Sequence, residues 1–371
     1  MALTPQTATE MTSRRAFLAG LAALAVPRPT WADAGSPAYL AAAKQGGAYF
    51  LHGLTETGEN LFALPLPSRG HAAAAHPTQA LAVAFARRPG TFAVVIDCAK
   101  GVEIARLTPP PGRQFNGHGV FSADGNTLYT SEVVAETSQG RIGLWDATTF
   151  ARIGEWDSGG IGPHDIKRMG DTLIVANGGI QTDPNDRSKL NLETMRPNLT
   201  QLSSTGQALA QAALPELPQN SIRHLAVSQT QVAFAMQWEG DPAEAVPLLG
   251  IWTPGASPIL CHAPEEEAFR MKGYAGSIAM TTDHIAITSP KGGVAMIFDA
   301  IGTHLASHER ADICGVVALP GGGFLASDGA GGLSLMEAAG LTRLSQTAVS
   351  WDNHIVCIRS LGEVLGIQTS H

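Results

Sequence analysis

Charge is scarce in this sequence, and no long hydrophobic run follows its N-terminal region. Asp, Glu, Lys and Arg make up 15% of the 371 residues, and the formal net charge is −8. This negative balance argues against nucleic acid and anionic membranes as partners, because both are negatively charged themselves. No internal run reaches the roughly 18 apolar residues that a membrane-spanning helix needs. We therefore expect no membrane span in the mature chain.

The short motifs of common enzymes are also missing. The sequence has no nucleophile elbow, phosphate-binding glycine loop, HExxH zinc motif or CxxCH haem-attachment motif. Nothing marks a hydrolase or a dehydrogenase, so the sequence leaves open whether the protein is an enzyme. The cysteines lie far apart without metal-type spacing, at Cys98, Cys261, Cys314 and Cys357. We expect no essential disulfide, because a thiol in an apolar strand usually behaves as a small hydrophobic group.

The N-terminal segment has the features of an export signal. Arg14 and Arg15 precede an apolar run, and a small-residue cleavage site ends at Ala34. The paired arginines favour the twin-arginine route, and the alternative, an ordinary secretory signal, leads to the same compartment. We therefore assign residues 1–34 to a twin-arginine signal peptide and residues 35–371 to a single periplasmic domain.

One hairpin-like segment recurs along the chain. Residues 115–132, FNGHGVFSADGNTLYTSE, contain two short apolar runs around a polar Asp-Gly turn, which predicts a β-hairpin. The first run opens on a histidine, and four other segments open in the same way. The histidines at this repeated position are His71, His118, His164, His224 and His354. Ser277 and Gly315 stand at the same position in two further segments.

Hydrophobic residues support this register independently of the histidines. In all seven segments the residues two and ten positions after the start are apolar, as paired strands facing a shared core require. Further strands follow each hairpin. The sequence therefore predicts an all-β fold, a seven-bladed β-propeller with four strands in each blade.

The ends of the chain fit closure of such a ring. The last segment, from His354, is too short for a complete blade, and the N-terminus of the mature chain offers the missing strands. We expect one blade to be closed by joining N- and C-terminal strands. Residues 38–45 and 363–371 both suit the second strand of this blade, and the sequence leaves the choice between them open.

The repeated histidines are expected to meet at the mouth of the central channel, because the first strand of each blade lines it. Neutral imidazole is the commonest metal ligand, and copper, iron, zinc and nickel suit ligand sets made only of histidine. We predict a metal site, with iron or copper as the ion, formed by His71, His118, His164, His224 and His354. The alternatives are structural hydrogen bonds between blades and an anionic substrate held by the histidines.

Polar residues also end the second strand of several hairpins and are expected at the same face. They are Arg87, Glu132, Asn177, Gln237 and Asp328. Glu132 is a candidate metal ligand or a partner that orients an imidazole, and its alternative role is that of a solvated loop acid. The other four are expected at the rim of the pocket. A long insertion at residues 178–203 emerges on this face and is a candidate lid.

Several segments resemble one known protein family. The segments that show this resemblance are GHGVFSADGNTLYTSE, GPHDIKRMGDTLIVANGGIQTDP, LNLETMRPNL and WDNH. They are similar to an uncharacterised family of exported propeller proteins whose genes often lie beside imelysin-like proteins and a di-haem oxidoreductase-like protein, in loci linked to iron uptake. The resemblance covers essentially the whole mature chain. It implies a periplasmic role in acquiring iron or another metal, with those proteins as partners, and supplies no catalytic residues.

Two classes of function follow from these observations. The first is a metal-binding accessory protein, expected to be monomeric, of a periplasmic uptake system. The second is a metal-dependent enzyme, either a lactonase-like hydrolase or an oxidoreductase subunit, since propellers of this shape also resemble lactonases and amine dehydrogenase subunits. A protein-docking propeller with structural histidines is a further alternative.

Overall fold

The structure is a computed structural model that describes residues 28–87, 92–186 and 188–358. Arg14 and Arg15, assigned above to an export signal, lie outside the described residues. Within the described residues, no helix is long and apolar enough to cross a membrane.

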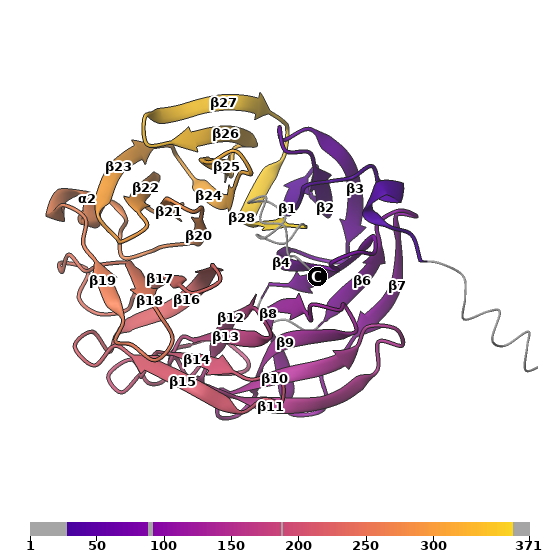
Figure 1. Cartoon of the computed structure of the whole chain (residues 1–371), viewed down its shortest axis with the longest axis horizontal. Coiled ribbons are helices and arrows are strands. Elements are labelled where there is room, and N and C mark those ends of the chain that lie inside the picture. Colours follow the sequence, from indigo (N-terminus) through magenta and orange to yellow (C-terminus); the bar gives the residue numbers. More distant parts are fainter. Residues whose placement is uncertain (1–27, 88–91, 187, 359–371) are drawn as a thin grey trace, which may run out of the picture.

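Seven four-stranded antiparallel sheets stand around a common axis (Figure 1). The predicted all-β fold and the number of seven blades are therefore confirmed. A short 3-10 helix, η1 (Trp31–Ala34), precedes the first strand, and a short helix, α2 (Glu265–Arg270), lies between two blades.

Six blades are each built from four consecutive strands, of which the first is innermost and the last outermost. The first of these blades contains β4 (Gly70–Ala75), β5 (Leu81–Ala86), β6 (Ala93–Asp97) and β7 (Val102–Leu107). The second contains β8 (Arg113–Phe121), β9 (Thr127–Val134), β10 (Gln139–Asp146) and β11 (Arg152–Ile161). The third contains β12 (Pro163–Met169), β13 (Thr172–Asn177), β14 (Asn198–Leu202) and β15 (Ala208–Ala213). The fourth blade contains β16 (Asn220–Val227), β17 (Val232–Trp238), β18 (Leu249–Trp252) and β19 (Ile259–Cys261). The fifth contains β20 (Ser277–Met280), β21 (His284–Ser289), β22 (Val294–Asp299) and β23 (His304–Glu309). The sixth contains β24 (Ile313–Ala318), β25 (Phe324–Asp328), β26 (Gly332–Glu337) and β27 (Gly340–Gln346).

The closing blade joins strands from both ends of the chain, as the sequence predicts. Its order is β28 (Ser350–Cys357), β1 (Tyr39–Gln45), β2 (Ala48–Leu54) and β3 (Asn60–Leu66). Tyr39 pairs with Cys357, so a strand from the beginning of the described chain completes a sheet begun by a strand from its end. The second position is thus filled by β1, and residues 363–371, the other candidate, lie outside the described residues.

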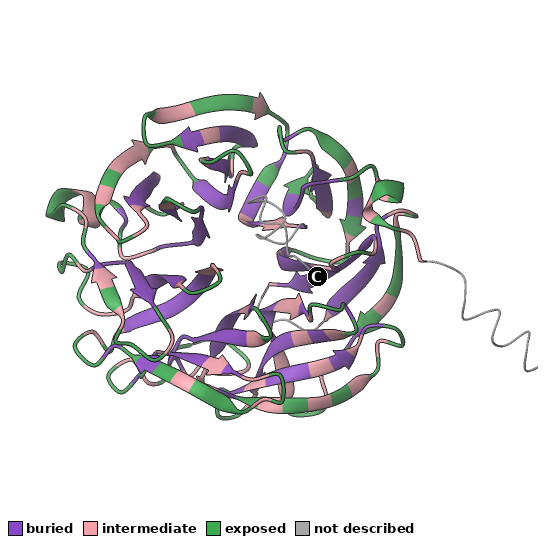
Figure 2. Ribbon diagram, in the orientation of Figure 1, coloured by how far each residue is buried: buried purple, intermediate pink, exposed green. Residues whose placement is uncertain are grey.

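Apolar side chains packed between adjacent blades form the core. In Figure 2 the inner strands are largely buried, whereas the outermost strands are mostly exposed or partly exposed. Phe85, Phe234 and Trp252 have almost no exposed surface. Complete burial of a large apolar side chain is worth roughly 1.5–3 kcal/mol, and many such residues line the blade interfaces. The main apolar contacts therefore lie between blades, and we expect the ring to hold together without help from a site near its axis.

The segment before the first strand packs against the outside of the propeller. The Trp31 indole donates a hydrogen bond of 2.8 Å to the carbonyl of His76. The Arg28 guanidinium donates to the carbonyls of Ala147 and Thr148 at 3.1 and 2.9 Å. Residues 28–34, which the sequence analysis placed in the signal peptide, thus contact the blades that contain β4 and β10.

Candidate metal centre

Five histidines from five consecutive inner strands meet near the axis of the ring. The His118 ring centroid lies 4.9 Å from those of His71, His164 and His354 and 5.7 Å from that of His224. The other four form a closed circuit, with neighbouring centroids 4.7–5.5 Å apart. His118 therefore caps a ring of four imidazoles. We call these five residues the histidine cluster.

A β-bulge in each of the five strands accompanies its histidine. In β8 Phe115 lies opposite Glu132 and Gly119 lies opposite Thr130. The three residues 116–118 of β8 therefore lie opposite a single residue of β9, Ser131. The registers of β4, β12, β16 and β28 are interrupted at the same level. Bulges re-aim side chains and are frequent beside functional sites. In this ring they accompany the convergence of the imidazoles, and the Ser131 hydroxyl ties two bulges together through the carbonyls of His118 and His164.

Gly117 is required by the bulge that presents His118. Its φ is +98°, in the left-handed region that favours glycine. A Cβ atom at this position would lie 2.6 Å from Cδ2 of His71, which is closer than side chains approach in practice. The glycine in the Gly-His pair therefore lets two imidazoles of the cluster come together.

The two remaining inner strands contribute no histidine to the cluster. The inner strands β20 and β24 carry Ser277 and Gly315 at the repeated position. A Cβ atom on Gly315 would lie 2.7 Å from the Ser327 hydroxyl and 2.9 Å from Ile355, so this position has no room for a histidine.

Asp165 orients His118 and is the residue that the sequence analysis missed. His118 Nδ1 lies 3.1 Å from Asp165 Oδ1, and both side chains are buried. The same carboxylate accepts the backbone N–H groups of Ile166 and Leu225, at 2.8 and 3.0 Å. A histidine that donates through Nδ1 keeps the lone pair on Nε2 for a metal, which is the carboxylate–histidine arrangement common behind metal ligands. The available signal was the acid directly after the histidine in PHDI.

Burial and nearby charge favour neutral imidazoles at two positions of the cluster. Burial, reinforced by repulsion from the other cationic groups nearby, holds the pKa values of His224 and His354 well below the usual value for histidine. Burial alone would raise the pKa of Asp165, but Lys167 and the His118 ring hold it well below its usual range. At neutral pH His224 and His354 are therefore uncharged, close to one fixed carboxylate.

The donor set fits a single metal ion. Two overlapping groups have ligand atoms within 4.8 Å of one another, namely His71, His118 and His164, and His118, His224 and His354. His118 belongs to both groups, and with Nδ1 bonded to Asp165 it has only Nε2 to offer. That atom lies 3.2 Å from Nε2 of His71. Two nitrogens bound at about 2.0–2.1 Å in tetrahedral geometry are roughly 3.3–3.4 Å apart, close to this spacing.

Two further nitrogens of the cluster also need a partner. Nδ1 of His224 and Nε2 of His354 are buried and make no hydrogen bond to any residue that the structure describes. A buried polar atom without a partner is costly, and a bound metal would supply one where the lone pair faces it. Together with the charges, these atoms make the cluster a site that could hold a metal ion.

Comparison with known proteins gives a family and a fold. Residues 64–358 match the family described as "Protein of unknown function (DUF1513)". The chain belongs to this family. No curated protein matches the sequence of this DUF1513 protein.

Solved structures similar to this DUF1513 protein show the fold alone, because the sequence identities are low. A chain from Kuenenia stuttgartiensis hydrazine synthase has 13% identity and a TM-score of 0.57, covering 82% of this chain and 91% of that one. A chain of a mitotic checkpoint complex has 9% identity and a TM-score of 0.54, with coverages of 75% and 77%. U3-55K has 12% identity and a TM-score of 0.54, with coverages of 75% and 81%.

Glu132 of the DUF1513 protein lies in β9, but its carboxylate is engaged away from the histidines. Oε1 accepts hydrogen bonds from the Thr130 hydroxyl at 2.7 Å and from Arg152 at 2.8 Å. A Cβ atom on Gly143 would lie only 1.9 Å from Oε1, so the carboxylate fills the space that this glycine leaves. The carboxylate found beside a histidine of the cluster is that of Asp165, next to His118.

The four predicted rim residues fall into two groups. Arg87 and Gln237 line a cavity of about 240 Å³ that also reaches His71, His164 and His224. Asn177 is buried and hydrogen bonds to Ser158 of β11 and Asn198 of β14, so it links strands of two neighbouring blades. Asp328 is buried and accepts a hydrogen bond of 2.7 Å from Arg310. Neither lines this cavity. The long insertion reaches the cavity through Lys189.

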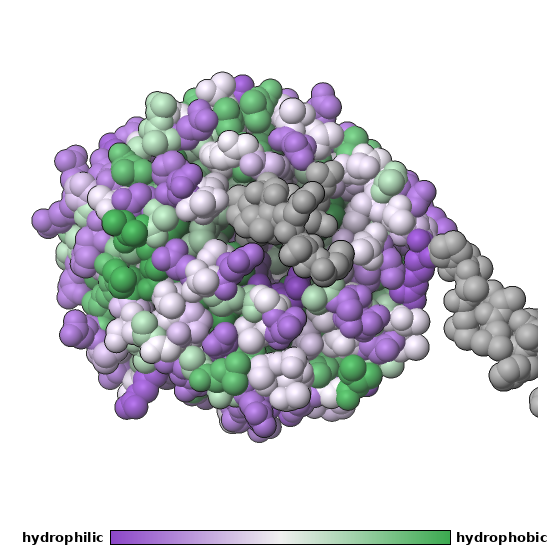
Figure 3. Space-filling view, in the orientation of Figure 1, coloured by the Kyte–Doolittle hydropathy of each residue, from purple (hydrophilic) through white to green (hydrophobic). Residues whose placement is uncertain are grey.

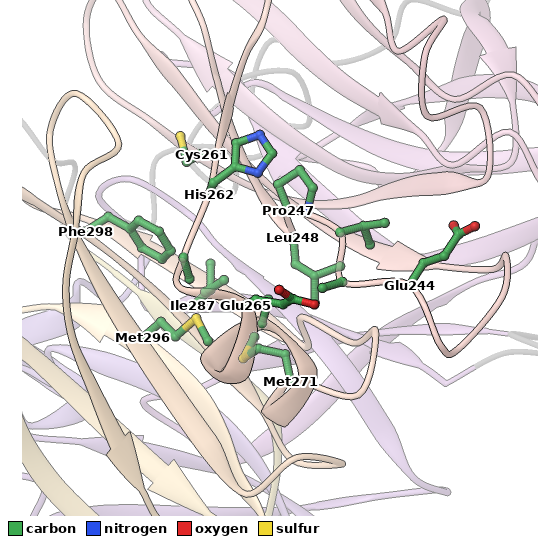
Figure 4. A pocket seen from close by; sticks show the side chains of 14 residues that line it. Glu244, Pro247, Leu248, Cys261, His262, Glu265, Met271, Ile287, Met296 and Phe298 are labelled. Atoms are coloured by element: carbon green, nitrogen blue, oxygen red, sulfur yellow. The ribbon is translucent and has the colours of Figure 1, made fainter.

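A second, larger cavity lies elsewhere in the DUF1513 protein. Its volume is about 500 Å³, and Figure 4 shows Ile287, Met296 and Phe298 on one side and Glu244 on the other. Most of its apolar lining belongs to the core cluster that contains Phe298, and none of the five histidines lines it. Figure 3 shows hydrophilic side chains over much of one face of the molecule, with hydrophobic ones in small separate groups.

Proposed function

We propose that this DUF1513 protein is an exported, periplasmic metal-binding propeller in which the histidine cluster holds one iron or copper ion. The observation that supports the proposal is the convergence of five imidazoles capped by His118, whose Nδ1 is committed to Asp165. An accessory role in metal acquisition, beside imelysin-like and di-haem proteins, is part of the proposal and derives from the resemblance of the sequence.

The proposal explains the cluster better than structural hydrogen bonding does. Histidines that tie blades together would each have partners on their own blade or the next. His118 has one such partner in Asp165 of the next blade, but its Nε2 faces Nε2 of His71. Buried nitrogens of His224 and His354 make no hydrogen bond within the described part of the chain. Neutral imidazoles brought together in this way satisfy one another poorly, whereas a metal ion accepts all their lone pairs.

Each residue of the site has a distinct task. His71, His118, His164, His224 and His354 are the candidate ligands, of which three or four bind directly. Asp165 holds the His118 tautomer and offsets part of the positive charge of the ion. Imidazole suits both copper and iron, and intrinsic affinity among divalent ions favours copper. The hydrolase alternative depended on Glu132 beside the metal, and this carboxylate binds Arg152 instead.

The test is metal analysis of protein purified without a histidine tag, followed by calorimetric titration of Cu²⁺, Fe²⁺ and Zn²⁺. We expect one ion per chain in the wild type. His118→Ala should lower the affinity at least about a hundredfold, and His354→Gln should also lower it. His284→Ala, which removes a histidine outside the cluster, is the matched control and should bind as the wild type does.

Stability measurements must accompany these titrations. The core lies between blades, so the metal-free protein should remain folded, with an unchanged circular dichroism spectrum. Equal affinity in the wild type and His118→Ala, or no binding by the wild type at neutral pH, would contradict the proposed function and leave the histidines as structural ties.

A further inference from the structure

The cavity of about 240 Å³ beside the cluster is strongly basic. Four cationic side chains line it, at Arg87, Lys189, Arg223 and Lys291, and the only acidic residue among its lining is Glu239. Three histidines of the cluster, His71, His164 and His224, form another part of its wall. The full chain carries a net charge of −8, so this concentration of positive charge is local.

Internal ion pairs leave part of this charge uncompensated. Glu239 pairs with Lys189. Within the described residues, Arg87 and Lys291 have no carboxylate within 4.0 Å. The Lys291 ammonium lies 4.5 Å from the centroid of the Tyr274 ring, a cation–π contact that holds it at the cavity wall without neutralising it.

Neutral hydrogen-bond donors complete the lining. The Asn353 amide lies 3.4 Å from the Tyr274 hydroxyl, and both residues line the cavity together with Gln237. Guanidinium, ammonium, amide and hydroxyl groups all donate hydrogen bonds, and donors on cationic groups bind oxyanions most strongly. The volume is below the roughly 300 Å³ at which pockets for drug-sized ligands begin, so the ligand is small.

A metal ion in the cluster would add positive charge beside this cavity. If the cluster binds a divalent ion, neutral imidazoles leave its charge intact and Asp165 offsets one unit. Lys167, 3.6 Å from Asp165, and Arg223, next to His224 in the chain, add positive charge nearby. The cavity lies beside His164 and His224, and an anion there would neutralise the ion and fill a coordination position.

We infer that this cavity binds a small carboxylate anion, which reaches the metal held by the histidine cluster and is gripped by Arg87 and Lys291. The inference rests on the proposed metal site and adds the class of ligand that this site takes. A planar carboxylate matches the fork of the Arg87 guanidinium, which can donate two parallel hydrogen bonds. Anion and metal then strengthen each other's binding by the same factor.

The test uses full-length protein loaded with Co²⁺ and titrated with sodium acetate and, separately, with sodium phosphate. Acetate should change the visible Co²⁺ absorption bands in a saturable manner. Arg87→Gln and Lys291→Gln should each raise the acetate dissociation constant about tenfold, the loss of one charge-assisted contact. Lys44→Gln removes an equal charge from the exposed end of β1 and should change nothing.

Calorimetric titration of acetate into metal-free protein separates the two proposals. If Co²⁺ binds but acetate produces no saturable change, or if Arg87→Gln and Lys291→Gln behave as Lys44→Gln does, the inference fails while the metal site stands. If Co²⁺ does not bind, yet the metal-free protein binds acetate in a manner sensitive to Arg87, the metal proposal fails and the cavity is an anion site alone. Phosphate binding tighter than acetate would overturn the assignment to a carboxylate.

Discussion

Gly117→Ala tests the geometry of the histidine cluster with the smallest change that the chain allows. The added methyl group would lie 2.6 Å from Cδ2 of His71, whereas ordinary contacts begin near 3.4 Å. The imidazole of His71 must therefore withdraw by about 0.8 Å or turn away. Metal–nitrogen distances tolerate changes of only about 0.2 Å, so His71 should be lost as a ligand. We expect the metal affinity to fall at least about tenfold.

A second cost comes from the backbone and must be separated from the first. The φ of Gly117 is +98°, and an alanine in the left-handed region costs roughly 1–2 kcal/mol. Gly112 provides the matched control, because its φ is +75° and a Cβ atom there would meet nothing within 4 Å. Gly112→Ala should lower the free energy of unfolding by a similar amount and leave metal binding unchanged.

Two measurements decide the outcome. Urea denaturation of metal-free protein gives the free energy of unfolding, and calorimetric titration of Cu²⁺ gives the affinity. Both variants should be less stable than the wild type, and only Gly117→Ala should bind the ion more weakly. If Gly117→Ala binds Cu²⁺ as tightly as Gly112→Ala does, His71 is not a ligand and the reasoning from the bulge is refuted.

Three further predictions follow from the charges and burial of the described residues. Asp165→Asn should lower the metal affinity about 10–100-fold, as loss of a partner behind a ligand usually does, whereas Asp97→Asn, at a distant buried acid, should leave calorimetric titrations unchanged. The metal-free protein should lose stability as the pH falls below about 6.5. His224 and His354 have lowered pKa values in the folded protein and stay neutral there, whereas the same histidines bind protons in the unfolded chain. The loss should grow steadily from pH 7 to pH 5, and a flat profile in urea denaturation would contradict it. Burial raises the pKa of the thiols of Cys98, Cys261 and Cys314 to about 12, so they should react with iodoacetamide at pH 8 only after unfolding. Rapid labelling of these thiols in the native protein would contradict this prediction.

The repeated register was sufficient to predict the fold. Each blade brings a hairpin in which apolar residues recur at fixed distances from the start of the inner strand. In the structure, all six described residues ten positions after a start are buried. They are Leu81, Leu128, Ile174, Phe234, Ile287 and Leu325. Since the pattern reflects burial between blades, it determines the architecture without knowledge of the site.

The side-chain directions at the cluster could not be predicted in the same way. Simple alternation along a strand assigns each residue to one face, but a bulge adds residues to one strand and changes the face of those beyond it. Glu132 lies at the expected end of β9, in a ladder with β10 that has no bulge, and its carboxylate pairs with Arg152 of β11. Position along β9 does not reveal this partner on an outer strand. Asp165 reaches His118 from the neighbouring blade, a contact between separate inner strands that spacing along the chain does not reveal.

Closure of the ring by β28 and β1 makes the histidine cluster a late product of folding. His354 lies in β28, and this strand pairs with β1, from the opposite end of the described chain. Contacts between residues so far apart in sequence form slowly, because a long loop must be closed first. A partly made or unclosed chain can present at most four of the five imidazoles. High-affinity metal binding would then indicate that the propeller ring is closed. An ion that prefers all five ligands would also stabilise the pairing between the two ends of the chain by its binding free energy.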